Sequence, residues 1–464
     1  MNLLDQKSAL DAVRIHEASL ELLSDPGIKM EHEGIRDLFL KNGASPGNEA
    51  DVVRVPREMV EEYLALCPPD VHLADRIGGG RTINATSAPA IWSCPGMNIH
   101  EKNSVRPFLA DDMARMTRLL DKLENVDGVF GMAMEDVVPN ERDVVGLLIM
   151  ARNTRKHIRA FCFTPAGGEA MVRMKNVLGK DAWFSVGFTA HGPLRWTHLA
   201  LDVFKATSGH GIPVTVNGEP MAGASGPVTI AGAAAVGNAE ILGGIVAVQL
   251  MEPGRPCIYN LGLAHVFDMR TMIAVTGAPE NALLAAISAA MGRHYNLPSA
   301  SWVSTESMCP DSQAALEKMF GFASHISNGV SNIWGVGQLE SELTISPSQA
   351  VMDNEMISYI NRFLRGVETN EETLAVDVTR EVGITGSYLD HLHTAEFFRA
   401  ELFMPKLLLR KKRDNWSAAG SKRLDERAEE VAQEMMKPSD ALSLGEAEHK
   451  ELQEIADWFS KNKK

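Results

Sequence analysis

The sequence predicts a (β/α)8 barrel that carries helical extensions at both ends. Eight short runs are rich in β-branched and aromatic residues, and a segment of helical periodicity follows each of them. Strands that alternate with helices form a parallel sheet, and eight such units favour closure of that sheet into a barrel. The length of 464 residues accommodates a barrel of roughly 250 residues together with the two extensions.

The expected strands are the residue ranges 90–93, 126–132, 158–163, 183–188, 213–217, 256–260, 300–304 and 332–336. Helical ranges between them include 111–123, 144–154, 197–208, 278–295 and 312–328.

The clearest unit surrounds residues 228–250, an Ala/Gly/Val/Leu segment that is too long for a strand and has proline at both margins. Alanine and glycine leave little side chain, so this helix can lie close to a sheet. Its apolar length would also suit a membrane span, but Asn238, Glu240 and Gln249 interrupt it and no basic loop flanks it. The segment therefore reads as a helix of the barrel, with no membrane association.

An open doubly wound sheet is the competing fold. That fold commonly carries a GxGxxG turn after an early strand, and none follows here. Gly78-Gly-Gly80 precedes Arg81 in an expected loop and lacks the spacing. The barrel is therefore the favoured fold.

The chain divides into an N-terminal helical extension at 1–85, the barrel with the active site at 86–345, and a C-terminal helical region at 346–464. The expected outer helices fall at 9–23, 30–42, 350–364, 424–436 and 444–459, and 53–66 is expected to form a further element. No linker rich in glycine or serine separates the parts, so we expect one compact unit.

Composition narrows the function classes. The formal net charge of -15 argues against nucleic-acid binding and weakly favours a cationic ligand. The five cysteines are an odd number without a CxxC pair, so a disulfide framework is not expected. With no positively charged and apolar leader pattern at its start, the sequence predicts a cytoplasmic protein.

In a (β/α)8 barrel, functional residues gather at the carboxyl ends of the strands. Aromatic residues make up 6% of the chain, yet many fall within the expected strands or at their ends. Ring faces accompanied by a few carboxylates bind quaternary ammonium groups through cation–π attraction worth about 2 kcal/mol when desolvated. Such rings also fill barrel interiors, and both interpretations stay open for each ring. The candidates are Trp92, Phe163, Phe188, Tyr259, Trp302 and Trp334.

A metal site is the rival interpretation. A thiolate, imidazole and carboxylate set would suit zinc, although no pair shows a tight ligand spacing. The candidate ligands are Cys94, Cys162, Cys257, His191 and Glu219. No GxSxG turn indicates a serine hydrolase. We therefore expect no metal.

Several segments carry a resemblance to a known family. They are Ile15-His-Glu-Ala-Ser-Leu-Glu-Leu-Leu23, Pro220-Met-Ala-Gly-Ala-Ser-Gly-Pro-Val-Thr-Ile230, Pro310-Asp-Ser-Gln-Ala314, Gly337-Gln-Leu-Glu-Ser-Glu-Leu-Thr344, Val351-Met-Asp-Asn-Glu355 and His393-Thr-Ala-Glu-Phe-Phe-Arg399. Their order and spread cover nearly the whole chain. With them the sequence resembles the trimethylamine methyltransferase family, and specifically its members without pyrrolysine, whose characterised type uses glycine betaine.

The resemblance implies transfer of a methyl group from a methylated amine to the Co(I) corrinoid (cobalamin) of a separate partner protein, with no cofactor held tightly by this chain. Only the twenty standard residues occur here, which points away from trimethylamine and toward a quaternary amine such as glycine betaine. Loop 306–309 is the expected counterpart of the pyrrolysine position, and the family precedent suggests a homo-oligomer.

The expected site combines strand-end residues with polar groups that would hold a substrate carboxylate. The candidate catalytic residues are Glu219, Glu306 and Glu340, and the candidate substrate-binding residues are the six aromatics above with His191, Asn217, His391 and His393; Arg195 is a further carboxylate-binding candidate. Two alternatives remain: an unrelated barrel enzyme, such as a metal-dependent hydrolase or lyase, and a non-catalytic betaine-binding protein.

Overall fold

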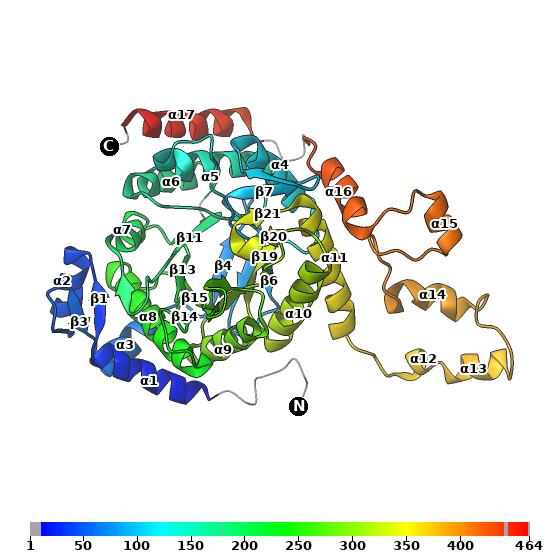
Figure 1. The fold of residues 1–464 in the computed structure, drawn as a ribbon, viewed down its shortest axis with the longest axis horizontal. Helices are drawn as coiled ribbons and strands as arrows, with labels where there is room; N and C mark the ends of the chain where they lie inside the picture. Colours follow the sequence, from blue (N-terminus) through cyan, green and yellow to red (C-terminus); the bar gives the residue numbers. More distant parts are fainter. Residues whose placement is uncertain (1–10, 180, 440–443, 463–464) are drawn as a thin grey trace.

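A closed barrel of eight parallel strands forms the centre of the computed structural model, which describes residues 11–179, 181–439 and 444–462 (Figure 1). The chain ends of the predicted extensions, 1–10 and 463–464, lie outside the described residues. The barrel strands are β6 (Ala90–Ser93), β9 (Gly128–Phe130), β10 (His157–Arg159), β11 (Phe184–Thr189), β13 (Val214–Asn217), β15 (Cys257–Gly262), β18 (Ser299–Trp302) and β19 (Asn332–Val336). Pairing of β19 with β6 closes the ring, which confirms the predicted barrel and excludes the open sheet.

Helices surround the barrel in the ring that Figure 1 shows. Apolar residues on the outward faces of the strands pack beneath them in one continuous core. The helices of the ring are α4 (Ala110–Lys122), α5 (Arg142–Asn153), α6 (Pro165–Val177), α7 (His198–Ala206), α8 (Ile230–Met251), α9 (Pro279–Tyr295), α10 (Ser312–Asn328) and α11 (Pro347–Leu364).

Helix α8 is the apolar segment predicted at 228–250. Among the described residues it is the one helix long and apolar enough to cross a membrane, and 83% of its apolar window is buried inside the protein. Glycines let it approach the barrel: a methyl group added at Gly244 would lie 2.3 Å from Trp196 Cζ2 and 2.6 Å from Val216 Cγ1. The apolar length of α8 therefore serves packing on both of its sides.

The N-terminal extension contains a small sheet as well as the expected helices α1 (Ala12–Ser24) and α2 (Glu33–Lys41) and the helix α3 (Arg57–Leu64). Strand β1 (Ile28–Met30) occupies the start of the range predicted as helix 30–42, because it pairs with β3 (Val52–Arg54) and with β12 (Arg195–Trp196) of the barrel loops. The Ser19 hydroxyl on α1 donates to the Ala235 carbonyl on α8 at 2.9 Å. The extension is thus joined to the barrel by both backbone and side-chain hydrogen bonds.

A hairpin of β4 (Val71–Ala74) and β5 (Gly80–Ile83) covers the amino ends of the barrel strands. Its apolar residues pack with the interior tryptophans, and Nδ1 of His157, at the start of β10, lies 2.8 Å from the Ala74 carbonyl oxygen. Strand β4 is accordingly seen inside the ring in Figure 1.

The opposite end of the barrel is walled by two small sheets built from the loops. One sheet combines β7 (Asn98–Glu101), β8 (Ser104–Pro107), β20 (Gln338–Leu339) and β21 (Thr344–Ile345). The other combines β14 (Met221–Ala222), β16 (His265–Asp268) and β17 (Ile273–Val275). We call the space between them the barrel mouth.

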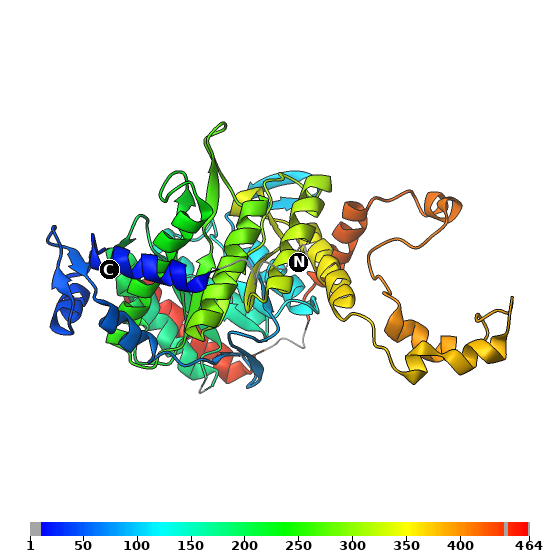
Figure 2. The same cartoon turned by 90° about the horizontal axis from the view of Figure 1, so that it is seen from below.

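The C-terminal region has two parts. Helices α16 (Leu424–Met435) and α17 (Glu446–Asn462) pack on the barrel helices, α16 against α11 and α17 against α6. Between α11 and α16 the chain projects away from the barrel as an arm with α12 (Glu371–Leu374), α13 (Val376–Val382), α14 (Leu392–Glu401) and α15 (Arg413–Ala418) (Figures 1 and 2). The expectation of one compact unit therefore does not hold for the arm, whose helices bury no side chain completely.

The close approach of α8 to the barrel predicts a steric penalty at Gly244. Gly244→Ala is expected to lower the free energy of unfolding by about 1 to 3 kcal/mol, because the added methyl group collides with Trp196 and Val216. Urea unfolding followed by tryptophan fluorescence measures the change.

Gly146 on α5 is the matched control, since a methyl group there would meet only Met134 Cε at 3.5 Å, an ordinary contact. Gly146→Ala is expected to keep or raise the stability, by up to about 1 kcal/mol, because alanine favours a helix. Equal losses in the two variants would contradict the close packing at Gly244.

Candidate active site

A cavity of about 170 Å3 lies at the barrel mouth, among residues at the carboxyl ends of the strands and in the loops beyond them. This is the place where (β/α)8 barrels hold their functional groups. We call it the mouth cavity. Its lining residues are Pro95, Phe130, Arg159, Phe161, Cys162, Phe163, Gly187, Phe188, Thr189, Asn217, Glu219, Leu263, Trp334 and Glu342.

Aromatic rings form a continuous wall of the mouth cavity. Phe130 packs edge-on against Trp334 with ring centroids 5.1 Å apart, and Phe161 follows Phe130 at 5.7 Å. Phe163 lies 5.0 Å from Phe161, and Phe188 lies 5.9 Å from Phe163. Five linked rings offer faces and edges to a ligand, and the faces attract a cation.

Two carboxyl groups face the same cavity. Glu219 follows β13, and Glu342 ends the short turn η2 (Glu340–Glu342). Burial raises the pKa of Glu219 to about 7, while burial and then the charge of Glu219 raise the pKa of Glu342 to about 8. His265 does not relieve this, because its Nδ1 lies 3.0 Å from the Leu263 carbonyl and 3.9 Å from Glu219, and burial lowers its pKa. The two carboxyl groups would be easier to ionise beside a bound cation.

Arg159, the last residue of β10, supplies a positive group to the same cavity. Its side chain donates to the Ala160 carbonyl at 2.5 Å and to the Gly187 carbonyl at 2.9 Å, and its guanidinium carbon lies 5.0 Å from the centre of the Phe130 ring. Burial lowers the pKa of Arg159 to about 9, so it remains charged at neutral pH. The mouth cavity therefore holds groups of both signs.

The structure brings five of the predicted site residues together at the mouth cavity: Phe163, Phe188, Asn217, Glu219 and Trp334. The Asn217 amide donates to the Thr189 hydroxyl at 3.1 Å and its oxygen accepts from Asn260 at 3.0 Å, which fixes its orientation. Their roles in binding remain predictions.

Three other aromatic candidates lie elsewhere. Trp92 stacks on His157 toward the hairpin end of the barrel, and Trp302 is buried beside His265. The hydroxyl of Tyr259 donates to Asn238 on α8 at 2.7 Å, so this side chain points outward to the helices. The alternation along β15 is the reason, because Asn260 next to it faces the interior.

The predicted carboxylate-binding residues do not line the cavity either. His191 is exposed in the loop after β11, and Arg195 pairs with Glu31 at 3.6 Å. His391 and His393 lie on the arm, where they line a separate cavity of about 670 Å3. The arm extends away from the barrel, so these two histidines do not fold over the mouth (Figure 2).

Glu306 and Glu340 brace the rim of the barrel. Glu306 accepts hydrogen bonds from the backbone N–H groups of Thr276 at 2.5 Å and Gly277 at 2.9 Å, and Glu340 accepts from the Thr344 hydroxyl at 2.5 Å. Neither residue lines the mouth cavity. In this structure their carboxyl groups hold loops in place.

Four residues that line the cavity were not predicted from the sequence: Arg159, Glu342, Phe130 and Phe161. Strand alternation carries a signal for two of them, because His157, Arg159 and Phe161 occupy alternate positions and Ile158 between them packs in the outer core. Glu342 stands two residues beyond the predicted Glu340, in a turn with positive φ angles whose direction the sequence does not reveal.

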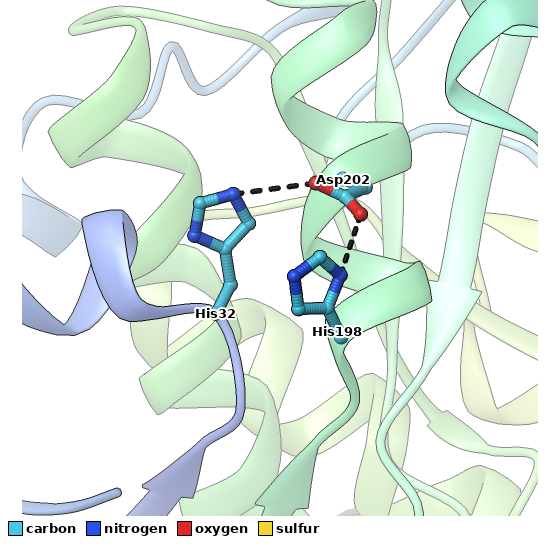
Figure 3. Close-up of side chains that lie close together, drawn as sticks. All are labelled: His32, His198 and Asp202. Carbon is cyan, nitrogen blue, oxygen red and sulfur yellow. Dashed lines mark ion pairs between the residues drawn. The ribbon is translucent and has the colours of Figure 1, made fainter.

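Among the described residues one group of three ligand-type side chains converges (Figure 3), and none of the three lines the mouth cavity. Asp202 Oδ1 lies 3.2 Å from His32 Nε2, and Asp202 Oδ2 lies 2.6 Å from His198 Nδ1. Nδ1 of His32 accepts from the Ile35 N–H at 3.3 Å, which places the ring proton on Nε2 and disfavours a metal there. The cluster joins the N-terminal extension to α7. The zinc ligands considered from the sequence form no such group.

A closed (β/α)8 barrel with a desolvated, charged cavity at the carboxyl ends of its strands is the architecture of a barrel enzyme. The sequence profile described as "Trimethylamine methyltransferase (MTTB)" matches residues 1–463. This chain belongs to that family and is a methyltransferase.

Individual relatives agree with this assignment. The trimethylamine methyltransferase MttB of Desulfitobacterium hafniense is 32% identical over 445 residues, covering 90% of this chain and 86% of the relative. The MttB protein of Methanosarcina barkeri is 30% identical over 467 residues, covering 96% and 93%. The glycine betaine methyltransferase of Desulfitobacterium hafniense is 28% identical over 424 residues, covering 87% and 86%.

A solved structure shows the same fold. The monomethylamine methyltransferase MtmB of Methanosarcina barkeri superposes with a TM-score of 0.53 at 13% identity, covering 95% of this chain and 92% of its own. At this identity the similarity concerns the fold alone.

The raised pKa values of Glu219 and Glu342 predict that the empty protein loses stability as the pH rises. The ordinary pKa of both groups is 4.5, so between about pH 4.5 and 8 the folded chain holds protons that the unfolded chain has released. Glu219→Gln and Glu342→Gln should each make the decline shallower across this window. Urea unfolding at several pH values measures it.

The exposed Glu169 on α6 provides the control, because Glu169→Gln should leave the slope unchanged. A decline of the same steepness in all four proteins would show that the two cavity carboxyl groups are not its source.

Proposed function

We propose that this protein transfers a methyl group from a quaternary amine, glycine betaine or a related betaine, to the Co(I) corrinoid of a partner protein and releases the tertiary amine. The observation that carries the proposal is the mouth cavity, in which five aromatic rings and two half-buried carboxyl groups surround a space for a small cation. Relatives named for trimethylamine and for glycine betaine support an amine as methyl donor.

The absence of pyrrolysine favours a quaternary amine over trimethylamine. A quaternary nitrogen already carries the positive charge that makes a neutral tertiary amine a good leaving group. Free trimethylamine would have to expel an amide-like anion as its leaving group unless it were first protonated. A cavity of aromatic faces and carboxyl groups suits the permanently charged donor better.

The reaction follows as an in-line displacement. Cobalt(I) of the partner attacks a methyl carbon, the cobalt–carbon bond forms as the carbon–nitrogen bond breaks, and the bonding electron pair stays on the departing nitrogen. No proton moves, so the chain needs no general base. Its contribution is positioning and the exclusion of water, and well-held reactants gain roughly 7 to 11 kcal/mol in this way.

The mouth must also admit a protein partner. The loops after β6, β13, β15 and β18 carry exposed apolar side chains, which favour a docking surface around the cavity. Their most exposed members are Met97, Val228, Met269, Met272, Ile273 and Met308. The chain needs such a surface because the attacking cobalt belongs to another protein.

We also include a homo-oligomer and a cytoplasmic location in the proposal. The arm carries nearly fully exposed apolar residues, among them Ile384 at 98% and Leu389 at 90%. A second copy of this chain is the partner we propose for them. The cytoplasmic location rests on the sequence pattern alone.

A spectroscopic assay tests the reaction. The protein is mixed with a reduced corrinoid protein and, in separate reactions, glycine betaine, proline betaine, carnitine and trimethylamine, and the loss of Co(I) absorbance is followed. We expect methylation with at least one betaine and none with trimethylamine. Methylation by trimethylamine alone would contradict the proposed donor, and betaine binding without any methylation would indicate a binding protein.

Met269→Asp tests the docking surface, because a charge at the tip of the β16–β17 loop weakens an apolar interface. We expect the KM for the corrinoid protein to rise by roughly tenfold while the Kd for the betaine stays unchanged. Ile77, 63% exposed on the hairpin at the other end of the barrel, is the control. Ile77→Asp should change neither value, and equal effects of the two variants would contradict docking at the mouth.

A further inference from the structure

Arg159 stands out among the buried arginines because its hydrogen-bonding capacity is only partly used. It is 4% exposed, and its Nε–H has no partner. No carboxylate forms an ion pair with it within the described part of the chain. Two carbonyl groups accept from a guanidinium that offers five N–H donors.

Arg255 is a buried arginine with a structural role, and its hydrogen bonds provide a comparison for those of Arg159. It is 1% exposed, and it donates to the Ile212 and Phe204 carbonyls and to the Thr207 hydroxyl, at 2.8 to 2.9 Å. Glu252 lies 3.5 Å from its Nε. Arg255 thus has partners on all sides, whereas Arg159 keeps free donors and lines a cavity.

The charges in the mouth cavity are separated along its depth. Arg159 is the last residue of β10, and Phe130 of the neighbouring strand β9 and Trp334 of β19 also line the cavity at the level of the strands. Glu219 and Glu342 lie beyond the strand ends, in the loops of the mouth. Among the described residues neither carboxylate forms an ion pair with Arg159. The positive end of the cavity is therefore the deeper one, and the negative end is the outer one.

We propose that Arg159 binds the carboxylate of a zwitterionic quaternary amine and thereby turns its ammonium group outward, toward Glu219, Glu342 and the attacking cobalt. This inference rests on the proposed function and narrows it to substrates that carry both charges. A guanidinium holds a carboxylate through two parallel N–H···O bonds, which fix orientation as well as position. The methyl groups then lie at the outer end of the cavity, among the loops of the mouth.

The same arginine discriminates between donors. A quaternary amine without a carboxylate would leave Arg159 buried and unpaired, and its own positive charge would be repelled by the guanidinium. Choline, which has the trimethylammonium group of glycine betaine and a hydroxymethyl group in place of the carboxylate, should therefore bind poorly. Trimethylamine lacks the carboxylate as well.

Isothermal titration of Arg159→Met and the wild type with glycine betaine, proline betaine, carnitine and choline tests the inference. The wild type should bind at least one betaine more tightly than choline, by roughly tenfold or more. In Arg159→Met that betaine should lose roughly ten- to hundredfold in affinity, while choline should keep or gain affinity because the repelling charge is gone. Arg159→Lys should recover part of the loss, since it restores the charge without the fork.

The opposite response of the two ligands separates binding from folding. Methionine removes a buried charge that has no counter-ion, so Arg159→Met is expected to remain folded, and thermal unfolding of each variant checks this. Equal weakening of betaine and choline, or choline binding in the wild type as tight as that of every betaine, would overturn the role of Arg159.

The methylation assay keeps this inference distinct from the proposed function. Methyl transfer from choline as fast as from betaines would overturn the carboxylate requirement and leave the reaction intact. Arg159-dependent betaine binding without methyl transfer from any donor would support the carboxylate site and contradict the reaction.

Discussion

The loss of water around charged groups is the constraint on which the mouth of this barrel depends. Arg159, Glu219 and Glu342 share one small cavity without ion pairs among them in the described structure. Burial lowers the pKa of Arg159 and raises the pKa values of Glu219 and Glu342, so in each case it favours the neutral form. A rigid frame is needed to keep such groups in place. The closed barrel supplies it through the Ala160 and Gly187 carbonyls that accept from Arg159.

The same constraint limits how tightly a cation should be held. As the carbon–nitrogen bond breaks, positive charge leaves the nitrogen, so contacts that favour the cation most strongly in the ground state slow the reaction. Ring faces attract a cation without carrying a full negative charge. They therefore oppose the loss of positive charge from the nitrogen less than an ionised carboxylate would. In the empty cavity the carboxyl groups, with pKa values of about 7 and about 8, are only partly ionised at neutral pH, so part of the attraction to an ammonium group is spent on ionising them, and net binding is moderate. Under the proposed function, the attraction of such a site is strong enough to bind the ammonium group and weak enough to let the tertiary amine form and leave.

The barrel was predictable because its signal is local and repeated: eight β-branched runs, each followed by a helical segment, correspond to the eight observed strands. The site was predictable where a residue follows a strand, as Phe163 and Glu219 show, because the strand ends converge in every such barrel. Prediction failed where the direction of a side chain determines whether it reaches the cavity. Tyr259 is an example, because side chains alternate between the two faces of β15 and this one points to α8. It failed again for His391, since nothing local indicates that the arm leaves the barrel. Arg159 was not predicted because it lies inside the expected strand range 158–163 and not at its end, and because its side chain faces the barrel interior.

Under the proposed function, the structures at the two ends of the barrel determine the order in which the betaine and the corrinoid protein bind. The β4–β5 hairpin packs into the amino end among the interior tryptophans, so substrate reaches Arg159 from the mouth. The corrinoid protein must use the same opening, because its cobalt has to meet the outward methyl group. The betaine therefore binds first, and the partner then covers it. Docking thus excludes water from the cavity at the moment when the desolvated charges act, so this chain needs no lid of its own. After transfer the tertiary amine, now an anionic carboxylate with a neutral nitrogen, leaves only when the partner has withdrawn.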